Sequence, residues 1–219
     1  MNKKYKAIIF DLDGTLLDTA SDLARAVNHV LTAHNLPTRS EQDVIAFTGN
    51  GADVLMRKCT PQIISEDELA IISKEFKAYY ALHSADNSAP YDGINEVLTE
   101  LHKRNYQLAV VSNKVHVATA SLTEQYFGEY IKVAVGDMPG YDKKPKLGTL
   151  KLALDKLGVD FADCIYVGDS EVDVMTATNA NMELIAVSWG FRSKEALIKA
   201  GAKNIAEKAY DIINIIDNL

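Results

Sequence analysis

Five short apolar runs, rich in β-branched residues, recur along this chain of 219 residues with amphipathic stretches between them. The runs lack the alternation of polar and apolar residues that marks a strand with one wet face, so they predict strands buried on both faces. Strands of this kind that alternate with helices are typical of a parallel sheet. We therefore predict an α/β fold with a Rossmann-like parallel sheet core, with strands at residues 7–10, 108–111, 132–135, 164–167 and 184–187, and helices at residues 93–104, 115–127 and 147–157.

The segment from residue 16 to residue 88 interrupts this alternation, because its pattern is helical and contains no convincing strand. The stretch from Asp18 to Ala33 is typical of a helix, and Ser65 and Glu68 form a capping box at the start of another. About seventy residues is far more than a crossover connection normally needs. We therefore predict an inserted α-helical cap at residues 16–88, while residues 1–15 and 89–219 form the α/β core that carries the active site.

A cluster of polar residues or glycines follows each predicted strand. Ligands of open parallel sheets bind outside the carboxyl ends of the strands, so we expect clusters that are distant in sequence to meet at one edge of the sheet. The clusters are Asp11–Thr15, Ser112–Lys114, Gly136–Asp137, Gly168–Ser170 and Ser188–Gly190.

Four aspartates are expected at this edge: Asp11, Asp13, Asp169 and Asp173. Carboxylates this close do not all stay ionised without a cation. Oxygen ligands suit Mg²⁺ better than Zn²⁺, and no histidine occurs in the clusters. Lys144 offers a fixed positive charge that would offset the carboxylates.

Asp11 and Asp13 are two residues apart, so along an extended chain they project to the same side with roughly 6.5 Å of rise between them. This spacing allows Asp11 to attack a phosphorus atom and form an aspartyl-phosphate. Asp13 would then protonate the leaving oxygen and later take a proton from water. Ser112, Asn113 and backbone amides are expected to bind the phosphate oxygens. Thr15 is also expected to contact the substrate, and it can cap the segment that follows.

The composition excludes several classes of function. The formal net charge of -7 argues against nucleic-acid binding, and no apolar run is long enough to cross a membrane. The apolar run behind the N-terminal lysines is too short for a signal peptide, so we expect a cytoplasmic protein. Cys59 and Cys164 are expected to be free thiols. The expected ligand is a small phosphorylated metabolite, and the expected oligomeric state is a monomer or a homodimer.

The polar clusters at the ends of the predicted strands, together with Lys144 and Pro145, resemble the motifs of the haloacid dehalogenase (HAD) superfamily, and in particular its phosphoglycolate phosphatase-like branch. The resemblance covers nearly the whole chain. It implies that Asp11 is the nucleophile and Asp13 the general acid/base. It also implies that Asp169 binds Mg²⁺, that Asp173 supports the metal site, and that Asp11 and the carbonyl of Asp13 complete the metal ligands. The helical insertion is similar to the C1-type cap of the family. The matching segments are Asp11–Thr15, Ser112–Asn113, Lys144–Pro145 and Gly168–Asp173.

The same resemblance implies that the cap loop Gly49, Asn50 and Gly51 faces the active site, where it would contact the substrate. Two positions depart from the branch. Leu147 stands where a second proline is usual, so Lys143 remains an alternative to Lys144. Asn181 stands where glycine usually ends a helix, and asparagine tolerates the left-handed conformation.

Other functions share part of this pattern. A pyrophosphatase or a sugar-phosphate phosphatase would use the same catalytic residues, so both remain alternatives. A phosphomutase usually carries valine in place of Thr15, and a dehalogenase needs no acid at Asp13. A signalling receiver domain is smaller and has no cap. A phospho-acceptor or interaction protein without catalytic activity would not need all four motifs.

Overall fold

The computed structural model describes residues 4–219, and its core is a six-stranded parallel sheet in the order β5-β4-β1-β6-β7-β8. All five predicted strands are present. The sixth strand, β8, was missed, because three residues at the edge of a sheet carry too short a pattern to be recognised. The strands are β1 (Ala7–Phe10), β4 (Gln107–Val115), β5 (Val133–Asp137), β6 (Cys164–Gly168), β7 (Glu183–Val187) and β8 (Asn204–Ala206).

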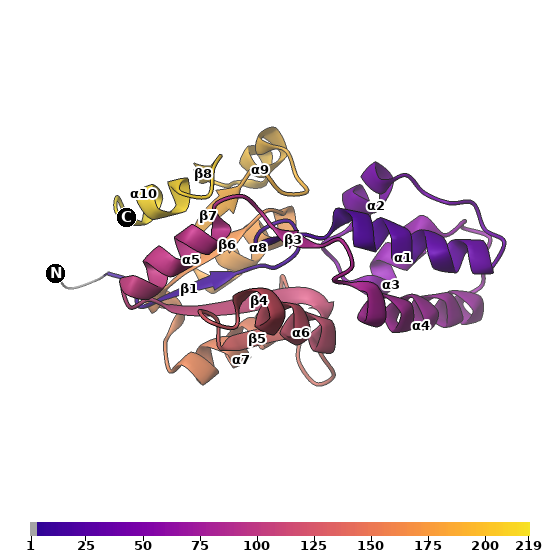
Figure 1. Cartoon of the computed structure of the whole chain (residues 1–219), viewed down its shortest axis with the longest axis horizontal. Coiled ribbons are helices and arrows are strands. Elements are labelled where there is room, and N and C mark those ends of the chain that lie inside the picture. Colours follow the sequence, from indigo (N-terminus) through magenta and orange to yellow (C-terminus); the bar gives the residue numbers. More distant parts are fainter. Residues whose placement is uncertain (1–3) are drawn as a thin grey trace.

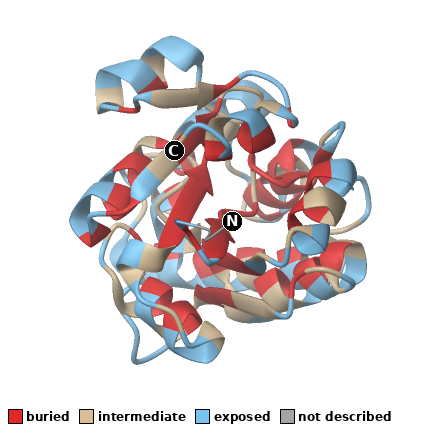
Figure 2. Cartoon of the chain, turned by 90° about the vertical axis from the view of Figure 1, so that its left-hand side faces the viewer, coloured by how far each residue is buried: buried red, intermediate tan, exposed pale blue. Residues whose placement is uncertain are grey.

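Helices cover both faces of this sheet. Alternate strand residues point to opposite faces, so Ile8 and Phe10 pack against α5, α6 and α10, while Ala7 and Ile9 pack against α7 and α8. The central strands β1, β4 and β6 are buried on both faces, as predicted (Figure 2), while β5 and β8 at the edges are only partly buried. The helices of the core are α5 (Ile94–Lys103), α6 (His116–Phe127), α7 (Gly148–Leu157), α8 (Glu171–Ala180), α9 (Lys194–Ala200) and α10 (Asp211–Ile216).

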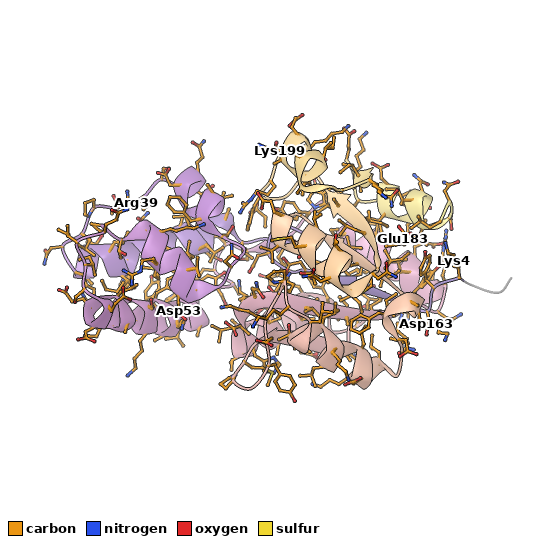
Figure 3. The ribbon with its side chains drawn as sticks, turned by 180° about the vertical axis from the view of Figure 1, so that it is seen from behind. Lys4, Arg39, Asp53, Asp163, Glu183 and Lys199 are labelled. Carbon is orange, nitrogen blue, oxygen red and sulfur yellow. The ribbon has the colours of Figure 1, made fainter. Side chains whose placement is uncertain are left out.

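Four helices between Ala20 and His83 form a separate unit at one end of the molecule (Figure 1). They pack around their own apolar cluster, which includes Val27, Met56, Ile72 and Phe76. We call this unit the cap. Charged side chains lie on the outside of both parts, such as Asp53 on the cap and Lys199 on the core (Figure 3). The helices of the cap are α1 (Ala20–Ala33), α2 (Glu41–Phe47), α3 (Ala52–Cys59) and α4 (Glu66–His83).

The cap joins the core through a two-stranded antiparallel ribbon of β2 (Leu17–Asp18) and β3 (Ala89–Pro90). The prediction that residues 16–88 contain no strand was therefore wrong at β2. Two residues carry no periodic pattern, and the partner strand lies far away in the sequence. The buried carboxylate of Asp22 in α1 also accepts hydrogen bonds from the backbone of Asn87 and Ser88, which ties the first cap helix to the returning chain.

Two predicted helix ends are confirmed: Ser65 and Glu68 form the capping box of α4, and Asn181 ends α8 in the left-handed conformation with φ of 51°. Helix α7 ends at Gly158, whose φ is 68°. Cys59 and Cys164 are both free and buried. Within residues 4–219, no helix is both long and apolar enough to span a membrane.

Candidate active site

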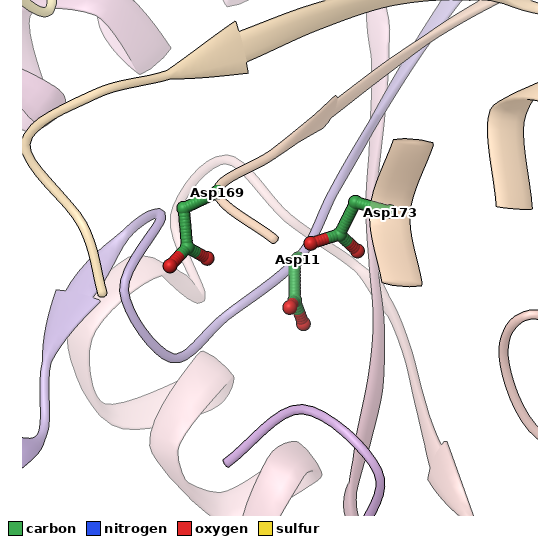
Figure 4. A group of neighbouring side chains, drawn as sticks. All are labelled: Asp11, Asp169 and Asp173. Atoms are coloured by element: carbon green, nitrogen blue, oxygen red, sulfur yellow. The ribbon is translucent and has the colours of Figure 1, made fainter. Parts of the chain in front are cut away.

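Three aspartates meet at the carboxyl end of the sheet (Figure 4). Asp11 follows β1, Asp169 follows β6, and Asp173 lies in the first turn of α8. Strands β1 and β6 are neighbours, with Phe10 opposite Val167, so the residues that follow them meet. One carboxylate oxygen of each aspartate lies within 4.8 Å of the others, and all three residues are buried. This group is the aspartate cluster.

Glycines allow the backbone to approach the aspartate cluster closely. A Cβ on Gly14 would lie 2.3 Å from Oδ2 of Asp169, and the φ of Gly14 is +79°. A Cβ on Gly190 would lie 2.1 Å from the carbonyl oxygen of Gly14 and 2.5 Å from Cβ of Asp169. No side chain fits at either position without moving Asp169, so the two glycines fix the position of that carboxylate.

Lys144 is the lysine that reaches the cluster. Its Nζ lies 3.0 Å from Oδ1 of Asp11 and 2.7 Å from Oδ1 of Asp173, and its side chain is 1% exposed. Lys143 instead pairs with Asp137 at 3.1 Å, and its side chain is 34% exposed. Of the two lysines left open by the sequence, only Lys144 contacts the cluster.

The remaining contacts hold the other two carboxylates in place. Asp169 accepts hydrogen bonds from the hydroxyl of Thr15 at 3.0 Å and from the backbone amide of Phe191 at 2.8 Å. Asp173 accepts hydrogen bonds from the amide and the hydroxyl of Ser170. The orientation of the cluster is therefore set by the core itself.

The cluster carries more negative than positive charge. Burial raises the pKa of Asp11 to about 6; the ammonium of Lys144 opposes this shift, while the charges of Asp173 and Asp13 add to it. Burial, followed by the charges of Asp173 and Asp11, also raises the pKa of Asp169 well above its usual range. Three buried carboxylates beside one ammonium are a donor set that suits a divalent cation bound through oxygen.

Asp13 faces a different set of partners. Its Oδ1 accepts hydrogen bonds from the hydroxyl of Thr19 at 2.7 Å and from Nζ of Lys114 at 2.7 Å. Asp13 is not part of the cluster, so its carboxylate is separate from those that would hold a cation. Both Asp11 and Asp13 line a cavity between the cap and the core.

The cavity also contains several of the residues that the sequence singled out. Ser112, Asn113, Gly49 and Gly51 line it. Asn113 donates hydrogen bonds to the carbonyl oxygens of Gly49 and Lys144, both at 2.9 Å, so its amide joins the cap loop to the lysine loop.

Two residues predicted to bind substrate lie elsewhere. Thr15 is fully buried and donates to Asp169, and it does not line the cavity. Asn50 lies between the two cavity glycines without lining the cavity itself. We therefore expect Thr15 to orient Asp169 rather than to contact substrate.

Three residues of this site were not assigned from the sequence. Lys114 belongs to the polar cluster after the 108–111 run, so it was expected at this edge of the sheet, but its contact with Asp13 was not predicted. Tyr80 of α4 and Arg192 of the loop after β7 line the same cavity. Tyr80 has the spacing of a core residue in an amphipathic helix, and nothing in the sequence around Arg192 indicates that it contacts the cap.

The comparison with protein families identifies the class. The family model of haloacid dehalogenase-like hydrolases matches residues 8–187, which span both the cap and the aspartate cluster. The chain therefore belongs to the haloacid dehalogenase-like hydrolase family.

Sequence relatives place the chain in the phosphoglycolate phosphatase-like branch of this family, as the sequence predicted. A phosphoglycolate phosphatase of Vibrio parahaemolyticus is 31% identical over 96% of this chain and 96% of its own length. A phosphoglycolate phosphatase of Haemophilus influenzae is 32% identical over 87% of this chain and 89% of its own length. A crystal structure from Lactobacillus delbrueckii is similar with a TM-score of 0.91 and 34% identity, covering 97% of this chain and 98% of that one.

Proposed function

We propose that this protein is a Mg²⁺-dependent phosphatase that hydrolyses small phosphate monoesters, with phosphoglycolate as the leading candidate substrate. The observation that carries the proposal is the aspartate cluster with Lys144, beside a separate carboxylate, Asp13, in the same cavity. A nucleophile and an acid/base with separate surroundings are what a two-step phosphoryl transfer needs. The names of the relatives support the choice of substrate.

In the proposed mechanism, Asp11 attacks the phosphorus and forms an aspartyl-phosphate. Asp13 gives a proton to the leaving oxygen, and then takes one from the water that attacks the phosphoenzyme. Lys144 holds the carboxylate of Asp11 and offsets its charge, while Ser112 donates to a phosphate oxygen. Asp11, Asp169 and the carbonyl of Asp13 would hold Mg²⁺, with Asp173 in support. When bound, the ion would neutralise the phosphate oxygens.

Residues of the cap and of the core together line the cavity in which this chemistry would take place. Arg192 of the core donates to the carbonyl oxygens of Ile45 and Thr48 in the cap, and Asn113 donates to that of Gly49. These contacts support a role for the cap loop in excluding water from the phosphoenzyme until the alcohol has left. We propose that residues 16–88 act as this cap, and that the cytoplasm is the compartment, since two buried free thiols fit a reducing environment.

Two assays test the proposal. We expect the wild type to hydrolyse phosphate monoesters in Mg²⁺, and to lose activity in EDTA. We expect Asp11→Asn to reduce kcat on the order of 1,000-fold or more, because it removes the nucleophile. Asp155→Asn, which makes the same change on an exposed face of α7, should keep wild-type activity. Turnover by Asp11→Asn at the wild-type rate would refute the assignment.

The preferred substrate is identified by measuring kcat/KM for a panel of phosphorylated compounds. Pyrophosphate and sugar phosphates would use the same catalytic residues, so they belong in the panel with phosphoglycolate. A kcat/KM for pyrophosphate or a sugar phosphate well above that for phosphoglycolate would leave the mechanism in place and change the substrate.

A further inference from the structure

Lys114 is a buried cation directly beside the proposed acid/base. It lies near the end of β4, its side chain is 4% exposed, and its Nζ is 2.7 Å from Oδ1 of Asp13. The same Nζ donates to the hydroxyl of Tyr80 at 2.5 Å and lies 4.4 Å from the centre of the Tyr80 ring. Tyr80 is contributed by cap helix α4, so the surroundings of Lys114 are complete only when the cap covers the core.

The other cations that line the cavity have partners of their own. Lys77 pairs with Asp53 on the cap surface. Arg192 pairs with Glu171 and donates to cap carbonyl oxygens. Lys114, in contrast, has Asp13 as its anionic partner, and that carboxylate must also face the leaving oxygen of a substrate.

Tyr80 holds Lys114 without adding a charge. Burial raises the pKa of the Tyr80 hydroxyl well above its usual value, and the charge of Asp13 adds to this shift, so Tyr80 is neutral. It accepts one hydrogen bond from Nζ, and its ring faces the ammonium. An ammonium has three donors, and the contacts with Asp13 and Tyr80 use two of them.

The wall of the cavity on the cap side is apolar, with Leu23, Leu55, Phe76 and Ala81 among the lining residues. A charged group on a substrate that enters this side would lose its water, and would need an opposite charge to compensate. Lys114 provides that charge for an anion. Among the described residues that line the cavity, the carboxylates are Asp11, Asp13 and Asp169, all committed to the proposed chemistry, so a cation on the substrate finds no free partner.

We propose that Lys114, held by Tyr80, is the residue that recognises a negatively charged group on the leaving alcohol. Nζ is 2.7 Å from the carboxylate that would protonate the leaving oxygen, so the group that it binds must lie close to that oxygen. A carboxylate on the carbon that bears the ester oxygen meets this condition. The inference rests on the proposed phosphatase activity, and it concerns the part of the substrate that departs, not the phosphoryl group.

Three esters with two-carbon leaving alcohols test this inference, because they differ in charge: phosphoglycolate, ethyl phosphate and phosphoethanolamine. For the wild type we expect kcat/KM to decrease in that order. Lys114→Met should reduce kcat/KM for phosphoglycolate about 10- to 100-fold, the effect of one charge-assisted hydrogen bond. The loss for ethyl phosphate should be smaller, because that ester loses only the effect of Lys114 on Asp13, and a native circular-dichroism spectrum would show that the variant folds. Tyr80→Phe should give a smaller loss that is again selective for phosphoglycolate.

Lys151→Met is the matched control. It removes one positive charge from an exposed position on α7, and should leave the order of the three esters as in the wild type. An equal loss for all three esters in Lys114→Met would overturn the inference, as would a wild type that does not distinguish them. If the wild type hydrolyses none of the esters, the proposed function fails. The inference is then judged by calorimetric binding of phosphoglycolate and ethyl phosphate, where equal affinities would overturn it.

Discussion

Replacing Lys144 by methionine tests the electrostatics of the site. The Nζ of Lys144 contacts two buried carboxylates, Asp11 at 3.0 Å and Asp173 at 2.7 Å, with the lysine side chain 1% exposed. These contacts are buried ion pairs, and removal of one partner of a buried ion pair lowers the free energy of unfolding by about 3–5 kcal/mol. Lys143 is its control, because it pairs with Asp137 while 34% exposed. Lys143→Met should cost less than about 1 kcal/mol.

The cost of Lys144→Met should depend on pH. Burial raises the pKa of Asp11 to about 6 in the metal-free protein, and the charge of Lys144 opposes that shift. Without Lys144 the pKa rises further. A carboxyl with a raised pKa in the folded state favours its neutral form, so the stability that it contributes is lost as the pH rises through that pKa. The variant should therefore be destabilised more near pH 8 than near pH 5.

Urea unfolding in EDTA at these two pH values measures the effect. The expected pattern is a large, pH-dependent loss for Lys144→Met and a small loss for Lys143→Met. Equal losses for the two variants, or a loss for Lys144→Met that does not change with pH, would refute the reasoning.

Three further changes give separate tests. Gly14→Ala places a Cβ 2.3 Å from Asp169 and should weaken Mg²⁺ binding about 10- to 100-fold by calorimetry; Gly140→Ala, with a similar positive φ but open space around it, should not. Because Asp11 has a pKa of about 6 without metal, Mg²⁺ affinity should decrease as the pH falls below about 6, and an unchanged affinity at about pH 5 would contradict this. Arg192→Ala removes two hydrogen bonds to cap carbonyls and should raise KM about 10-fold with less effect on kcat, as steady-state kinetics would show.

The strands were predicted well because each is a continuous apolar run, and such runs are determined by burial on two faces. A second rule, that ligands bind at the carboxyl ends of parallel strands, predicted that Asp11 and Asp169 would meet, and the strands before them are indeed neighbours. Strand β2 was missed because its pairing depends on a partner that returns only after the whole cap.

The contacts between cap and core could not be predicted from the sequence. Tyr80 has the spacing of an ordinary core residue, and only the position of the cap over β4 brings its hydroxyl to Lys114. Thr15 shows the opposite error. It was expected to contact the substrate, but its hydroxyl donates a hydrogen bond to Asp169. Side-chain direction in a tight turn depends on glycine conformations that the residue order alone does not specify.

The ribbon of β2 and β3 has a consequence for how such proteins diversify. The chain leaves and rejoins the core at residues that pair with each other, Leu17 with Pro90 and Asp18 with Ala89. Whatever lies between these strands can therefore be exchanged without changing the distance that the core must bridge. Recombination at this junction would join the same core to a different cap. The residues of the core, Asp11 among them, would then keep their positions while the cap side of the cavity changes, and with it the substrate specificity.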